Sequence, residues 1–292
     1  GTLNLAQLAQ LAPDSLQGHQ GLAAFALMVI GFGVKAELFP LNTWVPEVYA
    51  TALARVAALL AGLVSKLAVL VVVRLLVLVF PQPEASQLLL ILGVLGVVTG
   101  ELAAWRARDF PRMIAFSSIG QLGIVFIAFS IGGDIGLLAG IAVALHHLIV
   151  KSAFFGLAAR WSGSLDGLTG AARRSPWAAG LFVLFALSLI GVPPLLGFWT
   201  KILALAAVLL ATAVEANYLF RVALGLYGRS DTPPAPPARL DLGAAVLLGV
   251  VLIGVSLSIA PLAEGLREVA RQAGDAALYV ETVFPKTLAG RE

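Results

Sequence analysis

Long apolar runs constrain this chain more than any other feature. About eight stretches have the apolar length of a spanning or half-spanning helix, and they cover residues 21–34, 56–78, 88–104, 113–131, 135–158, 177–192, 195–219 and 242–259. One crossing of a bilayer takes roughly 20 helical residues. The alternating segments of about ten residues that form membrane barrels do not occur, so the backbone must satisfy its hydrogen bonds as helices. The sequence therefore predicts an all-α, polytopic membrane helix bundle with about eight or more transmembrane helices.

Composition excludes a soluble domain and several kinds of chemistry. Hydrophobic residues make up 60% of the chain and charged residues only 12%, with a mean hydropathy of +0.96. Cysteine does not occur, which excludes thiolate-bound iron–sulfur clusters, thiolate-bound zinc and disulfides. We expect no cofactor and no bound metal. The net charge of +3 indicates loop orientation rather than an anionic partner, and we expect no nucleic-acid partner.

Three segments outside the apolar runs have distinct patterns. Residues 1–19 form a polar, loop-like lead, and because no initiator methionine precedes it we expect further sequence before it. Residues 232–237 are a proline-rich connector that cannot be helical throughout. Residues 262–280 mix charged and apolar positions at helical spacing, which predicts an amphipathic tail on the membrane surface or on a partner. Arginines crowd alternate connections and place those connections on the cytoplasmic side; they are Arg106, Arg108 and Arg112, and Arg160, Arg173 and Arg174.

Two lysines end two copies of one short pattern. Lys66 closes the run Leu-Ala-Gly-Leu-Val-Ser-Lys, and Lys201 closes Leu-Leu-Gly-Phe-Trp-Thr-Lys. A lysine near the centre of a membrane helix costs roughly 2.5–3.5 kcal/mol on insertion scales, so a chain that repeats the arrangement is predicted to use the charge. Movement of protons or ions is the use we favour. Two alternatives stay open: Lys66 paired to a carboxylate for assembly alone, and Lys201 extending to the membrane surface.

A helix break is predicted just before the second lysine. Pro193 and Pro194 remove backbone donors and clash with the preceding turn, and Gly197 follows them. Such breaks at membrane depth are tolerated where the freed carbonyls line a hydrated cavity. Lys201 would then point into that cavity, unless the prolines form a simple hairpin between two ordinary helices.

Further polar residues in apolar surroundings are candidates for the same site. His147 and Lys151 lie one turn apart, so the histidine could pass a proton to the lysine. His146 points elsewhere on the helix and could bond a neighbouring helix, and adjacent histidines do not favour a metal. The remaining candidates are Lys35 and Glu37, as a relay pair or as interfacial anchors, Glu101 as a counter-ion, and Ser117 and Gln121 as water-linked bridges or helix-to-helix contacts.

Taken together, these motifs resemble the antiporter-like membrane subunits shared by complex I, membrane-bound hydrogenases and Mrp-type sodium/proton antiporters. The matching runs are Lys-Ala-Glu-Leu-Phe-Pro-Leu from Lys35, the two lysine patterns, Ile-Ala-Phe-Ser-Ser-Ile-Gly-Gln-Leu-Gly from Ile114, and His147 to Lys151. Within this family the chain is most similar to the D-type subunit of Mrp antiporters. The resemblance implies inverted repeats with broken helices, in which Lys66 and Lys201 take the broken-helix positions, His147 and Lys151 link them, and Lys35 matches a sixth-helix lysine.

On this resemblance the chain divides into five parts. Residues 1–19 are the lead, 20–131 the remainder of a first antiporter repeat, 132–229 a shortened second repeat, 230–260 a linker with the last transmembrane helix, and 261–292 the amphipathic tail. The family usually has a lysine where Pro111 stands and a histidine where Asn42 stands. It also usually has Pro-x-Pro where Leu53, Ala54 and Arg55 stand, and this departure together with Pro111 adds weight to a scaffold role as the third alternative, behind proton translocation.

Three functions are weighed on this basis. The first is a membrane subunit that translocates protons, with Na+ as the candidate exchanged ion, within a multisubunit complex. The second is the proton-pumping arm of a redox complex whose redox centres lie on other chains, so that this chain itself performs no redox catalysis. The third is a scaffold subunit that does not conduct. Each implies other membrane subunits and bilayer lipids as partners, and a multi-pass location in the cell (inner) membrane of a bacterium or archaeon.

Overall fold

The computed structural model describes residues 2–16, 18–161, 163–203, 205–229 and 242–283. Within these ranges the regular secondary structure is helical, apart from one isolated β-bridge between Asp109 and Ser164. The predicted all-α class is confirmed. The proline-rich connector predicted at 232–237 lies outside the described residues.

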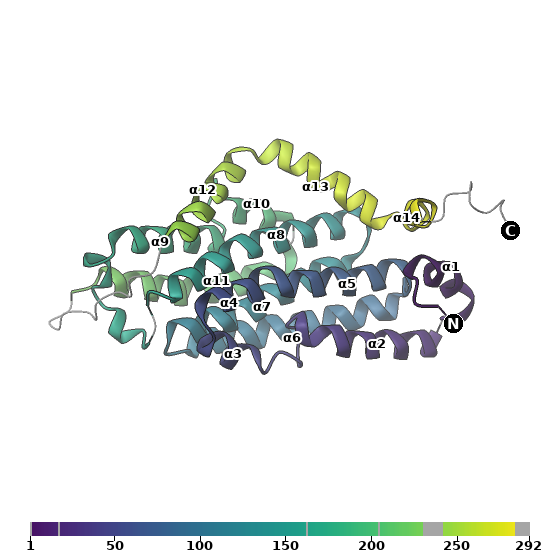
Figure 1. The fold of residues 1–292 in the computed structure, drawn as a ribbon, viewed down its shortest axis with the longest axis horizontal. Coiled ribbons are helices and arrows are strands. Elements are labelled where there is room, and N and C mark those ends of the chain that lie inside the picture. Colours follow the sequence, from purple (N-terminus) through teal and green to yellow (C-terminus); the bar gives the residue numbers. More distant parts are fainter. Residues whose placement is uncertain (1, 17, 162, 204, 230–241, 284–292) are drawn as a thin grey trace.

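Four helices are long and apolar enough to cross a membrane in the part of the chain that the structure describes. The first is continuous over Ala54–Leu78 and consists of α4 (Ala54–Leu59), a π-helical turn η1 (Leu60–Val64) and α5 (Ser65–Leu78). The others are α6 (Pro83–Arg106), α7 (Phe110–Ile131) and α8 (Gly133–Ala158). These helices run side by side along the long axis of the molecule (Figure 1).

The other helices are shorter, bent or divided. A fifth span is formed if α12 (Gly243–Leu257) and α13 (Ile259–Gly274), which meet at 89°, are taken together. The predicted run 195–219 is divided between α10 (Leu196–Leu203) and α11 (Leu205–Tyr227). The remaining helices are α1 (Leu5–Ser15), α2 (Gly18–Lys35), α3 (Val45–Thr51), α9 (Pro176–Ile190) and α14 (Ala276–Val283), with short 3-10 turns at Asp166–Leu168 and Ala171–Arg173. The predicted count of about eight crossings thus includes apolar helices shorter than a full crossing, such as α9.

Glycines bring α6 and α7 into close contact. A Cβ atom on Gly93 would lie 2.9 Å from the carbonyl oxygen of Gly123, and one on Gly100 would collide with the backbone nitrogen of Gly120. Small residues at such crossings let two membrane helices approach closely. Close approach increases the van der Waals contact between the helices, which is a main source of their attraction inside a membrane. The side chain of Glu101 therefore lies directly over Gly120 on α7.

The prediction of a loop-like lead is wrong, because residues 5–15 form α1. Asn4 caps the helix, since its Oδ1 accepts from Ala6 N at 2.9 Å and from Gln7 N at 3.3 Å. Leu5 and Leu8, with Ala12 a turn further on, recur at helical spacing and pack against the core. The intervening polar residues hid this apolar stripe in the sequence.

The amphipathic tail packs on the bundle itself. Helix α13 lies along α8, and α14 reaches the helix α1 at the other end of the chain (Figure 1). Ala270 of α13 is buried, and the guanidinium of Arg74 on α5 lies 4.7 Å from the centre of the Tyr279 ring on α14. One side of the tail thus contacts the bundle, while Val269 and Leu278 remain exposed, so the predicted contact with a membrane surface or a partner stays a prediction.

Candidate functional site

Three carboxylates and three lysines are buried in the described interior. Each has at most 8% of its surface exposed; they are Glu37, Glu101, Glu215, Lys66, Lys151 and Lys201. Charges out of water are costly unless they are balanced and hydrogen-bonded. Equal numbers of the two signs make this interior neutral when all six groups are ionised, which is the arrangement that a buried set of charges requires.

Both lysine patterns are held against α8 by a glycine. Gly62, four residues before Lys66, leaves no room for a side chain because a Cβ there would collide with Ser152 Oγ on α8. Gly197, four residues before Lys201, is equally close: its Cβ would lie 2.9 Å from His146 Cε1 on α8 and would collide with the Ser188 carbonyl on α9. The repeated glycine therefore explains how both lysines come to lie beside the helix that carries Lys151.

Lys66 lies just after the π-helical turn η1. Its Nζ donates to the carbonyl oxygen of Ala61 and to Ser65 Oγ, the latter at 3.0 Å. The Ser65 hydroxyl also donates to the Ala61 oxygen at 3.0 Å. Widened turns of this kind are common at functional sites in membrane and soluble helices. The charged groups that act on Lys66 are Glu37 and Lys151.

A hydrogen-bonded chain crosses four helices at the centre of the molecule. Lys151 Nζ on α8 donates to Ser117 Oγ on α7. The Tyr218 hydroxyl on α11 lies 2.7 Å from the same Ser117 oxygen and donates to Glu101 Oε2 on α6 at 3.0 Å. The second oxygen of Glu101, Oε1, has no partner among the described protein groups. The predicted candidates Lys151, Ser117 and Glu101 are therefore brought together.

A second cluster surrounds Lys201. Its Nζ lies 2.7 Å from Glu215 Oε2 and donates to Thr212 Oγ1 at 3.0 Å, both on α11. Gln121 Nε2 on α7 donates to the other oxygen of Glu215 at 2.8 Å. Within the described residues, Lys201 and Glu215 form the one ion pair that is buried on both sides.

The chain is interrupted at the predicted prolines. Helix α9 ends at Ile190, α10 begins at Leu196, and Pro193 and Pro194 lie in the connection. The first amide of α10 is held by α12, because Leu196 N donates to Ser256 Oγ on α12 at 2.8 Å. Lys201 Nζ lies 3.5 Å from the carbonyl oxygen of Ile190, which is one of the groups exposed by the interruption.

The two histidines of α8 have different surroundings. His146 Nε2 lies 2.9 Å from Ser188 Oγ on α9. His147 is fully buried, and neither ring nitrogen makes a hydrogen bond of normal geometry with a described protein group, although the Ser118 backbone lies beside the ring. Lys66 and Lys151 both act on it electrostatically. No group of three or more potential metal ligands occurs within the described residues.

The structure separates Lys35 from Glu37. Lys35, the last residue of α2, is exposed, whereas Glu37 is 1% exposed and receives a hydrogen bond from the Tyr49 hydroxyl at 2.7 Å. Lys35 is therefore not joined to the buried set.

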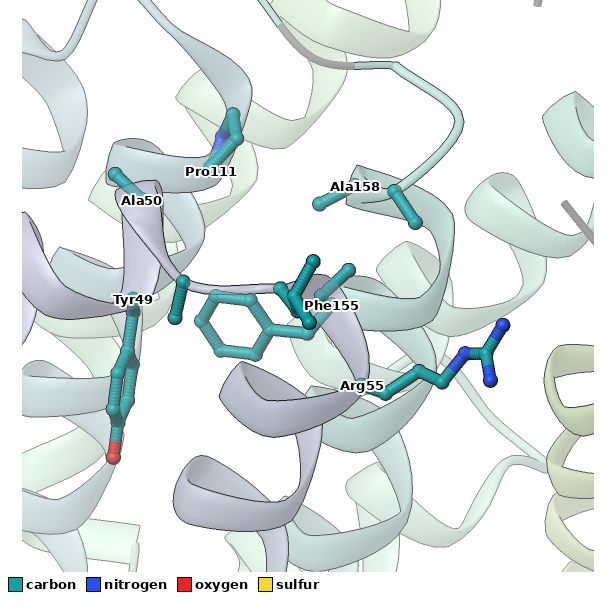
Figure 2. Close-up of a pocket in the computed structure, with 10 residues that line it drawn as sticks. Tyr49, Ala50, Arg55, Pro111, Phe155 and Ala158 are labelled. Carbon is teal, nitrogen blue, oxygen red and sulfur yellow. The ribbon is translucent and has the colours of Figure 1, made fainter. Parts of the chain in front are cut away.

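Tyr49 also lines a cavity of about 490 Å³ between α3, α4 and α8. Figure 2 shows Phe155 in the middle of this cavity and Arg55 on the side opposite Tyr49, whose hydroxyl points away from Ala50 and Pro111. The inner wall of the cavity thus leads through Tyr49 to Glu37.

Several residues of the site were missed in the sequence, namely the hydrogen-bond partners Tyr49, Ser65 and Thr212, and the buried residues Glu215 and Tyr218. Glu215 and Tyr218 lie three positions apart, which places them on one face of α11. Glu215 is a single carboxylate in an apolar run, as Glu101 is, and the same reasoning could have identified it.

Apolar helices of membrane-spanning length around a row of buried charges define a multi-pass membrane protein with a charged interior. The family described as NADH:quinone oxidoreductase/Mrp antiporter, transmembrane, matches residues 1–226, and this chain belongs to it. The resemblance noted in the sequence is confirmed.

Curated relatives come from two kinds of complex. The N-type subunit of the NADH-quinone oxidoreductase of Desulforudis audaxviator is 30% identical, over 89% of this chain and 58% of that protein. The D-type subunit of the Na+/H+ antiporter of Alkalihalophilus pseudofirmus is also 30% identical, over 97% of this chain and 62% of that protein. The chain thus spans about three-fifths of the length of these relatives.

Solved structures share the fold. A chain of the membrane-bound sulfane sulfur reductase, an archaeal respiratory membrane complex, superposes with a TM-score of 0.88 at 29% identity, over 97% of this chain and 62% of that one. A chain of the Mrp complex from Dietzia sp. has a TM-score of 0.86 at 24% identity, over 97% of this chain and 64% of that one. The second likeness concerns the fold alone.

Proposed function

We propose that this chain is a membrane subunit that translocates protons along its buried charges, within a multisubunit complex of a bacterial or archaeal cell membrane. The observation that carries the proposal is the chain from Lys151 through Ser117 and Tyr218 to Glu101, in which each group lies within hydrogen-bond distance of the next. A hydroxyl that both donates and accepts can pass a proton between a lysine and a carboxylate. Such buried titratable groups in membrane helices are rare outside ion pathways.

The other buried groups extend this path in both directions. Toward α5, both Lys66 and Lys151 act electrostatically on His147, whose buried ring nitrogens lie beside the Ser118 backbone and can also bond water. Toward α10, Lys201 and its ion-pair partner Glu215 would continue the path. The path would therefore run from Lys66 through His147 and Lys151 to Lys201.

The names of the relatives suggest two sources of energy. One relative is a subunit of a Na+/H+ antiporter, and another is a subunit of an NADH-quinone oxidoreductase. Exchange of protons for Na+ is the form we favour, because the sequence pattern is most similar to the D-type antiporter subunit. The partners would then be other membrane subunits, with bilayer lipids around them.

Proton movement can be measured in inside-out membrane vesicles that carry the full chain with its native partners. We expect Lys66→Ala and Lys201→Ala to abolish the pH change while the complex stays assembled. Arg267→Ala, which removes an exposed cation on α13, is the matched control and should transport normally. Addition of Na+ should collapse an imposed pH gradient if exchange is the mechanism. Acidification that instead requires a redox substrate would identify the pumping arm of a redox complex, and normal transport in both lysine variants would leave the scaffold function.

A further inference from the structure

An apolar groove lies at the surface of the bundle where α1, α2 and α5 meet. Its volume is about 480 Å³, which is within the range of sites that hold small molecules. Helix α1 contributes Leu5 and Leu8, and α2 contributes Met28 and Phe32. Every side chain that lines the groove is apolar except that of Arg74 on α5. The groove therefore combines an apolar channel with a single positive charge.

One face of α5 determines how apolar surface and charge are distributed along the groove. Leu67, Leu70, Val71 and Arg74 all line it and are spaced three or four residues apart, so they lie on one stripe of the helix. Leu67 is near the midpoint of the span Ala54–Leu78, and Arg74 is about 10 Å further along the helix axis, close to the end of the span. The groove is therefore apolar toward the middle of the span and charged near its end.

The guanidinium of Arg74 lacks a counter-ion within the described structure. None of the ion pairs found there includes Arg74, and its Nη1 is buried without a hydrogen-bond partner among the described protein groups. Tyr279 of α14, which reaches this end of the bundle beside α1 (Figure 1), has its ring centre 4.7 Å from the guanidinium carbon. A ring against one face of a guanidinium does not use the N–H donors at its edge. Because a buried donor without an acceptor is costly, this end of the groove favours an anionic ligand.

We infer that the groove binds one anionic phospholipid, with an acyl chain along α5 and the phosphate group at Arg74. A phospholipid has the same order of properties as the groove, since its charge lies near the membrane surface and its chains extend toward the middle. Arginine also suits a phosphate, to which it can donate two parallel hydrogen bonds. A headgroup without an ammonium group avoids a second cation beside Arg74. This inference is independent of proton translocation, because it rests on a surface away from the buried charges.

Photo-crosslinking of a lipid to the full chain with its native partners tests the inference. The complex is reconstituted in phosphatidylcholine vesicles that contain a small fraction of phosphatidylglycerol with a diazirine in its acyl chain, and labelled peptides are mapped after illumination. We expect labelling of the α5 segment that contains Leu67 and Leu70. Arg74→Gln should reduce it about tenfold, because a hydrogen bond between charged groups is lost. Arg267→Gln makes the same change at an exposed arginine on α13 and should leave the labelling unchanged.

Two further comparisons keep the test decisive if Arg74→Gln fails to assemble. Leu70→Trp fills the groove and should abolish the labelling, whereas Ile91→Trp, at an equally exposed position on α6 outside the groove, should not. In the unaltered complex, a diacylglycerol with the same diazirine chain but no phosphate should label the segment about tenfold less.

Four results would overturn the inference. They are undiminished labelling in Arg74→Gln, undiminished labelling in Leu70→Trp, equal labelling by the diacylglycerol, and no labelling of α5 in the unaltered complex, as a neighbouring subunit in the groove would cause. Competition by inorganic phosphate alone would also count against it, because the site would then recognise a free anion rather than a lipid.

Discussion

Removing the charge of Glu215 should reveal what the buried ion pair between Lys201 and Glu215 contributes to the free energy of unfolding. At 2.7 Å between Nζ and Oε2, the attraction is about 6 kcal/mol at an effective dielectric constant of 20. Removing each ion from water costs several kcal/mol, so the net contribution of the intact pair is small. Removal of one partner is different, because it leaves the other charge buried without compensation, at a cost of about 3–5 kcal/mol.

Glu215→Gln is the single change that isolates this effect. The amide oxygen still accepts from Gln121, so the loss concerns the charge opposite Lys201. We expect the apparent melting temperature of the detergent-solubilised complex to fall by on the order of 10 °C. The double variant Lys201→Met with Glu215→Gln removes both charges and should recover most of that loss, within about 1 kcal/mol of the unaltered protein.

Stability and transport should then move in opposite directions. The double variant is expected to be nearly as stable as the unaltered protein and yet inactive in the vesicle assay, because the lysine that exchanges the proton is gone. Two results would refute this reasoning: a double variant no more stable than Glu215→Gln, or a Glu215→Gln protein that melts normally. Either would show that the pair is not a compensated buried charge.

Two other predictions follow from contacts in the bundle. Gly100→Ala forces a Cβ into the backbone of Gly120 and should lower the free energy of unfolding by about 1–3 kcal/mol, as measured by thermal unfolding. The control is Gly31→Ala on α2, whose Cβ meets nothing within 4 Å and should be neutral or slightly stabilising. Tyr218→Phe removes the hydroxyl that links Ser117 to Glu101 and should slow the initial rate of vesicle transport about tenfold or more. Because the buried Glu101 loses a donor, the protein should also be destabilised by about 1–3 kcal/mol, and the exposed Tyr227→Phe should show neither effect.

The sequence predicted those parts of the structure that depend on local pattern. Apolar runs of the right length predicted the helices, and the apolar flanks of Lys66 and Lys201 indicated burial, which is 6% and 8% exposure in the structure. Two prolines predicted the interruption before α10. Each of these features is decided within a few residues of where it occurs, so a single sequence is sufficient.

Features that depend on packing between distant segments were beyond this reasoning. Tyr218 reaches Glu101 from 117 positions along the chain, and no local pattern indicates such a contact. Lys35 and Glu37 looked equivalent in the sequence. In the structure Glu37 has a left-handed backbone conformation just after α2 and is buried, whereas Lys35 is exposed. The stripe of α1 was hidden because its apolar residues become contiguous only on a folded helix.

The π-helical turn at Leu60–Val64 also bears on how a helix can hold a charge inside the membrane. A π turn bonds residue i to residue i+5, so it is wider than a regular α-helical turn. In this chain the widened turn precedes Lys66, and the Ala61 carbonyl within it accepts two side-chain hydrogen bonds. The helix thus offers one of its own carbonyl groups to the lysine side chain, and an ammonium group can reside inside the membrane without a partner from another helix.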